Sequence, residues 1–74
     1  MLYEKDDYEG ALVHLERAVA LVPNNAGYQA WLGACYKALG RYQEARAALE
    51  QALQLDPERQ DARNLLDDLT SMGY

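Results

Sequence analysis

The chain repeats itself at a fixed interval of 34 residues, and this period constrains the fold more than any other feature. Tyr8 recurs as Tyr42 and Pro23 as Pro57, with no gap in between. The other pairs at this offset are Ala11 and Ala45, Leu15 and Leu49, Glu16 and Glu50, Ala18 and Ala52, and Leu21 and Leu55. Such a period is typical of proteins built from stacked supersecondary units, each of which buries its apolar face against the next.

Apolar side chains recur at helical spacing in four stretches, and no stretch alternates with the period of two typical of a strand. Gly40 suits the left-handed end of a helix, and Pro23 and Pro57 mark turns or helix starts. The connections are short, so we expect consecutive helices to pack as antiparallel hairpins in an all-α protein. The expected helices cover Tyr8 to Val22, Tyr28 to Leu39, Gln43 to Leu55, and roughly Arg59 to Met72.

Alanines stand seven residues apart within two of these helices, as Ala11 and Ala18 and again as Ala45 and Ala52. Two helices approach closely only where one side of their contact is small, and larger residues such as Leu49 then fill the gaps between the alanines. We therefore expect the alanines to be the close-approach positions of the helical hairpins.

The same residues resemble the pattern of the tetratricopeptide repeat family. In that pattern, leucine takes the place of phenylalanine at Leu49, and Gln29 stands where the family has tryptophan, next to Trp31. The positions that fit the pattern are Leu32, Gly33, Tyr36, Ala45, Leu49 and Pro57. The resemblance implies antiparallel helical hairpins stacked as a short right-handed superhelix, an α-solenoid fragment of about four helices.

By register with this family, the chain is expected to be one domain over residues 1–74. Residues 1–25 would form a partial first repeat, residues 26–59 a complete repeat, and residues 60–74 a capping helix and tail. The chain would then begin within a repeat, which indicates a piece of a longer array.

Function in this family, by resemblance, is protein–protein interaction, with a peptide or partner helix held on the concave face formed by the first helices of successive repeats. Ala30 and Ala34 occupy two positions where members that clamp a carboxylate carry polar or basic residues, so we expect no carboxylate clamp. The expected groove face consists of Gly27, Ala30, Ala34, Lys37, Ala38, Asp61, Asn64 and Asp68.

An alternative hypothesis is that the chain is a small self-associating unit with a mainly structural role. The apolar stripe of the first helix, which includes Leu15, is expected to lack the helix that covers it in a longer array, and exposed apolar patches mark interfaces. A homodimer could form through this stripe. The expected outer contacts are Tyr3, Leu12, Val13, Val19, Tyr28 and Trp31.

Several function classes are disfavoured by composition. The net charge is −5 and no basic cluster stands apart, which argues against nucleic-acid binding. No apolar run is long enough for a membrane span, and the chain as given favours the cytoplasm without fixing its compartment. His14 and Cys35 are the only histidine and cysteine and are predicted to lie on different helices, so we expect no enzyme activity, no metal and no cofactor.

Overall fold

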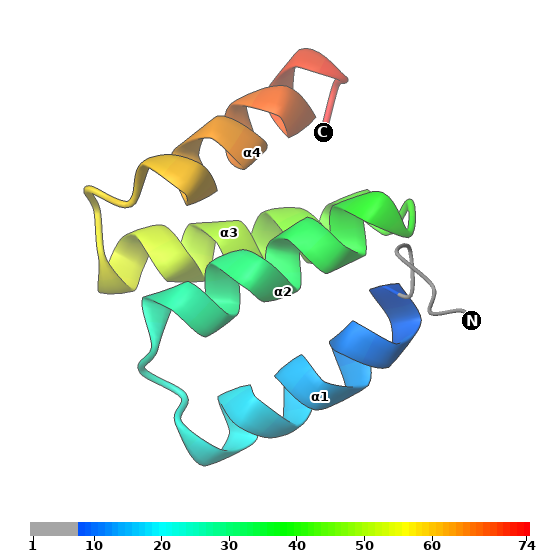
Figure 1. The fold of residues 1–74 in the computed structure, drawn as a ribbon. Coiled ribbons are helices and arrows are strands. Elements are labelled where there is room, and N and C mark those ends of the chain that lie inside the picture. Colours follow the sequence, from blue (N-terminus) through cyan, green and yellow to red (C-terminus); the bar gives the residue numbers. More distant parts are fainter. Residues whose placement is uncertain (1–7) are drawn as a thin grey trace.

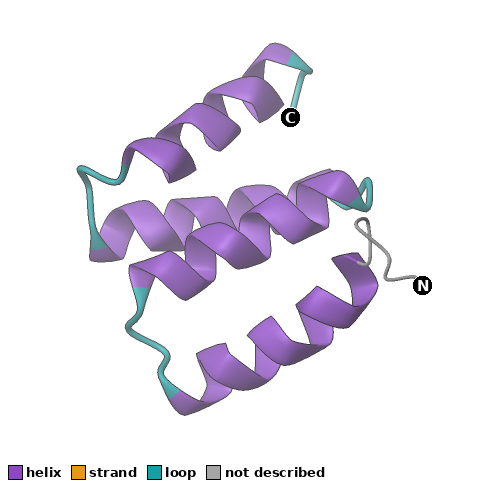
Figure 2. Ribbon diagram, in the orientation of Figure 1, coloured by secondary structure: helices purple, strands orange, loops and turns teal. Residues whose placement is uncertain are grey.

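The structure is a computed structural model that describes residues 8–74, and these residues form four helices without a strand (Figures 1 and 2). The all-α prediction is therefore confirmed. The expected helix ends differ from the observed ones by at most two residues. The helices are α1 (Tyr8–Leu21), α2 (Ala26–Ala38), α3 (Tyr42–Leu55) and α4 (Gln60–Ser71).

The ends of α2 are fixed by local chemistry. Asn25 is its N-cap, and its side-chain oxygen accepts a hydrogen bond from the Tyr28 N–H at 3.0 Å, which is why the helix starts at Ala26. At the other end Gly40 adopts a positive φ of 84°, and the Arg41 N–H donates to the Tyr36 carbonyl at 2.8 Å. This is the glycine-ended hydrogen-bond pattern that turns the chain back sharply.

Consecutive helices pack as antiparallel neighbours, and α2 lies at the centre of the molecule (Figure 1). Helix α2 contacts α1, α3 and α4, whereas α1 contacts no helix other than α2 among those described. The fourth helix packs on both α2 and α3. Helices α2 and α4 therefore lie side by side although a whole helix separates them in the sequence.

The first core cluster joins α2, α3 and α4. Ala45 and Ala52 are fully buried, as the seven-residue spacing predicts. Leu49 fills the space between them and is also fully buried. The buried members of the cluster are Ala30, Ala45, Leu49, Ala52, Ala62 and Leu69.

The second core cluster joins α1, α2 and α3, and it corrects one expectation. Leu12 was expected on an uncovered stripe, but it is only 6% exposed, and Leu15 is only 5% exposed. Both belong to one cluster with Leu32, Cys35 and Ala48, because α2 covers this side of α1. Leu12 is therefore a core residue and is not available for an outer contact.

Candidate functional site

A cleft of about 370 Å³ opens between α2 and α4 and the turn that precedes α4. We call it the α2–α4 cleft. It is lined by Gly27, Ala30, Trp31, Ala34, Arg59, Asp61 and Leu65. Four of these residues, Gly27, Ala30, Ala34 and Asp61, were expected on the groove face.

The small residues of α2 leave room for the cleft. Ala30 is 2% exposed and Gly27 and Ala34 are half-buried, so together they form a shallow floor. Leu65 on α4 supplies an apolar wall. Trp31 is 59% exposed although it lines the cleft, so a large aromatic surface is available to a ligand.

The charged groups of the cleft are paired at short range. Arg59 Nε lies 3.2 Å from Asp61 Oδ1 in an ion pair, but this buried nitrogen makes no hydrogen bond with the described residues. The Asp61 carboxylate instead accepts the Ala62 N–H at 2.8 Å. The Arg59 side chain also lies close to Gly27, since a methyl group on Gly27 would be 3.4 Å from Arg59 Nη2. The buried Nε of Arg59 thus lacks a hydrogen-bond acceptor among the described residues.

A second ion pair joins the same two helices beside the cleft. Lys37 Nζ lies 3.8 Å from Asp68 Oδ2, and the two side chains are 27% and 65% exposed. A partly exposed pair of this kind contributes about 0.2–1 kcal/mol at most. Because Lys37 already faces a carboxylate of this chain, a ligand carboxylate would have to compete for it.

The remaining groove-face residues lie on the same helices but do not line the cleft. Ala38 is exposed at the end of α2. Asn64 is exposed on α4, where its side-chain oxygen accepts a hydrogen bond from Gln60 Nε2 at 3.0 Å. Arg59 was missed from the sequence because it lies in the turn between α3 and α4, where helical register does not apply. Leu65 of α4 was missed because it packs against the first core cluster as well as lining the cleft.

The expected outer contacts do not form one surface. Val13 is 58% exposed on α1, whereas Val19 and Tyr28 are half-buried against the second core cluster. Trp31 belongs to the α2–α4 cleft instead. Tyr3 lies outside the described residues.

Residues 8–74 contain no group of three or more side chains positioned to hold a metal ion. Cys35 is buried, and this burial raises the pKa of its thiol, which keeps it in the less nucleophilic protonated form. None of the helices in this part of the chain has the length and apolar character needed to cross a membrane.

Stacked antiparallel helical hairpins with a 34-residue period define a helical-repeat protein. The chain belongs to the tetratricopeptide repeat family, whose model matches residues 2–69. This confirms the resemblance drawn from Leu32, Gly33, Tyr36 and the positions that follow them. Tetratricopeptide repeats are generally protein–protein interaction modules without catalytic activity.

Two curated proteins are similar to the chain. One is DnaJ homolog subfamily C member 7 of Mus musculus, which is 37% identical over 54 residues, or 73% of this chain. The other is the Protein STIP1 homolog of Dictyostelium discoideum, which is 38% identical over 64 residues, or 85% of this chain. The chain spans only 11% of the length of each relative. No solved structure gave a significant match.

Proposed function

We propose that this chain is a scaffold or adaptor module that holds a peptide segment or a partner helix in the α2–α4 cleft. The observation that carries the proposal is the exposed indole of Trp31 beside a floor of small side chains. Such an opening accepts one large apolar side chain of a partner, with the indole packed against it. The Arg59 guanidinium, which lines the cleft, is suited to donate a hydrogen bond to a backbone carbonyl next to that side chain.

The charges of the cleft favour a neutral ligand over a doubly anionic one. Lys37 and Arg59 each lie within 4 Å of a carboxylate of this chain, as the 3.8 Å and 3.2 Å distances show. Ala30 and Ala34 add no donor. We therefore infer that the module is not a carboxylate clamp, and that it acts by binding and not by catalysis.

Selection of a randomised twelve-residue peptide library on the intact chain tests this proposal. Trp31 is the only tryptophan, so a peptide bound in the cleft is expected to shift its fluorescence emission to shorter wavelength. The variant Ala34→Glu fills the cleft and is expected to abolish binding. The matched variant Ala20→Glu places the same side chain at an exposed position of α1, outside the cleft, and is expected to leave binding unchanged.

Three results would contradict the proposal. One is a selected peptide whose binding is lost in Ala20→Glu but kept in Ala34→Glu. Another is saturable binding that leaves the emission of Trp31 unchanged. The third is failure to select any peptide.

The exposed apolar residues on α1 and just after it favour a second candidate function, self-association. Val13 and Leu21 of α1 and the following Val22 are 58%, 76% and 48% exposed. For the leading function we propose instead a longer array as the setting of this chain. Light scattering over a range of protein concentrations distinguishes the two functions. A molar mass that rises with concentration, and no longer rises in Val13→Asp, supports self-association. A constant monomer mass excludes self-association.

A further inference from the structure

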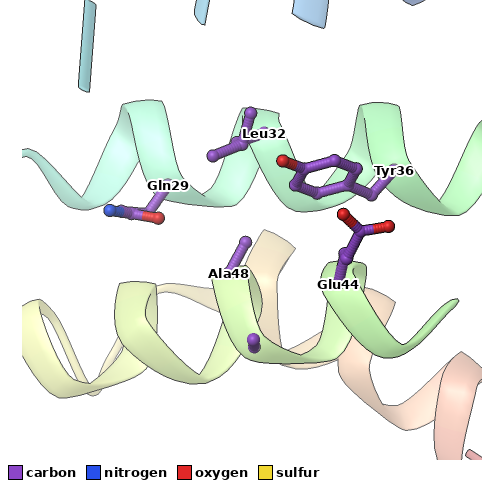
Figure 3. A pocket seen from close by; sticks show the side chains of 6 residues that line it. Gln29, Leu32, Tyr36, Glu44 and Ala48 are labelled. Carbon is purple, nitrogen blue, oxygen red and sulfur yellow. The ribbon is translucent and has the colours of Figure 1, made fainter. Parts of the chain in front are cut away.

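A second groove, of about 290 Å³, lies between α2 and α3 (Figure 3). We call it the α2–α3 groove. Its floor is apolar, because Leu32 and Ala48 are only 8% and 7% exposed and belong to the second core cluster. The residues that line it are Gln29, Leu32, Tyr36, Glu44, Ala47 and Ala48.

This groove lies on the opposite side of α2 from the α2–α4 cleft. At about 100° of rotation per residue, residues 29, 32 and 36 project about 180° from residues 27, 30, 31 and 34. The two sets share no residue. A partner in one opening therefore need not contact the lining residues of the other.

One end of the α2–α3 groove is acidic. The Tyr36 hydroxyl donates a hydrogen bond to Glu16 Oε2 of α1 at 3.2 Å, and the Glu44 carboxylate lies beside the Tyr36 ring in Figure 3. Burial, the hydrogen bond to Glu16 and the charges of Glu16 and Glu44 raise the pKa of Tyr36, and Arg41 opposes this. Both carboxylates thus act on the same end of the groove.

The nearby cation only partly neutralises these carboxylates. Arg41 Nε lies 3.9 Å from Glu44 Oε1, and the two side chains are 52% and 56% exposed. Such a long and solvated pair is weak. A cation inserted from the partner side is therefore able to replace Arg41 at Glu44 at little cost.

We propose that the α2–α3 groove docks a lysine or arginine side chain of a partner protein, with an apolar residue next to it in the partner sequence. The aliphatic stem of the basic side chain lies on Leu32 and Ala48, and its charged end reaches the carboxylates of Glu44 and Glu16. Charge complementarity selects the occupant, since an acidic side chain is repelled at the same place. The net charge of −5 adds a general attraction for a basic partner.

A pair of short peptides tests this assignment on the intact chain by NMR titration. One is the acetylated and amidated peptide Ala-Ala-Leu-Arg-Ala-Ala, and the other replaces arginine by citrulline, which has nearly the same shape and no charge. We expect the arginine peptide to shift the amides of Leu32, Tyr36, Ala47 and Ala48 saturably, and to bind more weakly as salt is added. We expect the citrulline peptide to bind several-fold more weakly.

Two variants with the same change of net charge complete the test. Glu44→Gln is expected to weaken the arginine peptide about two- to five-fold, since it removes one partly exposed charge contact. Asp67→Asn removes a carboxylate from α4, away from the groove, and is expected to leave its affinity unchanged.

Three outcomes would overturn the proposal. Equal affinity for the citrulline peptide would show that the groove binds through apolar contacts and does not recognise the positive charge. Shifts confined to Gly27, Ala30 and Ala34 would place the peptide in the α2–α4 cleft. Shifts of the groove amides that grow with protein concentration in the absence of peptide would identify a second copy of this chain as the occupant.

Discussion

Gly33 on α2 lies directly against Leu49 on α3. A methyl group on Gly33 would stand 2.6 Å from Leu49 Cγ and 2.7 Å from its Cδ2, and 3.2 Å from the Ala45 carbonyl oxygen. Leu49 is fully buried, so its side chain has little space in which to move aside. The absence of a side chain at Gly33 therefore sets how closely the two helices of the complete repeat approach.

Replacing Gly33 with alanine is expected to destabilise the chain even though alanine is the better helix former. The gain in helix propensity is about 1 kcal/mol, whereas overpacking a core costs about 1–3 kcal/mol. We expect a cost at the upper end of that range, because the added methyl group would clash with the Leu49 Cγ atom and with the backbone and not only with a flexible side-chain end. We expect a net loss of about 1–2 kcal/mol in the free energy of unfolding, measured in urea.

The matched control is Gly27→Ala on the same helix. Its methyl group would meet the Asn25 side-chain oxygen at 3.1 Å and the Arg59 side chain at 3.4 Å, and the arginine is able to move. Its effect is expected to stay within about 0.5 kcal/mol. A Gly33→Ala protein as stable as the original chain would show that α2 and α3 are farther apart than described.

Ala52→Leu tests the close approach of α3 to its neighbours. Ala52 is fully buried, and three added carbon atoms have no space there, so we expect a loss of about 1–3 kcal/mol. Ala47→Leu adds the same atoms to an exposed position of α3 and is expected to change stability by less than about 0.5 kcal/mol. Equal melting temperatures for the two variants would refute the packing of α3.

The sequence was sufficient to predict the four helices and the burial of Ala45 and Ala52, because a fixed period and a small-residue spacing both repeat along one chain. It did not predict the burial of Leu12. Apolar residues occur on more than one side of α1, so their pattern alone does not show which of them α2 covers.

The cleft was predicted only in part for a similar reason. Gly27, Ala30 and Ala34 follow from their register on α2, whereas Arg59 lies in a turn, where no helical period applies. Trp31 was assigned to an outer surface because it stands two residues from the usual aromatic position. Its place in the cleft depends on how α4 packs beside α2, which no local pattern specifies.

The N-cap of α2 is a separate test of local structure. Asn25→Ala removes the acceptor of the Tyr28 N–H and is expected to cost about 1 kcal/mol of unfolding free energy. Asn24→Ala, one residue earlier in the exposed turn, is the control and is expected to have a much smaller effect. Thermal melts followed by circular dichroism distinguish them, and an equal loss in both variants would argue against the cap.

Burial of Cys35 predicts a pH dependence of stability. Its pKa is raised in the folded chain, whereas the unfolded thiol ionises at about 8.5. Above that pH the folded chain therefore holds more protons than the unfolded chain. The contribution of Cys35 to the free energy of unfolding is complete below about pH 8.5 and is lost as the pH rises through the raised pKa. We expect urea stability to fall as the pH rises above about 8.5, and to fall less in Cys35→Ala. The same slope in both proteins would contradict this prediction.

The central position of α2 has a consequence for how the molecule opens. Helix α2 contacts each of the other described helices, whereas α1 contacts only α2 among them. Detaching α1 leaves the contacts among α2, α3 and α4 in place, but releasing α2 breaks up both core clusters at once. Native-state hydrogen exchange is therefore expected to protect the amides of α2 up to the free energy of complete unfolding, while α1 exchanges through a smaller, separate opening.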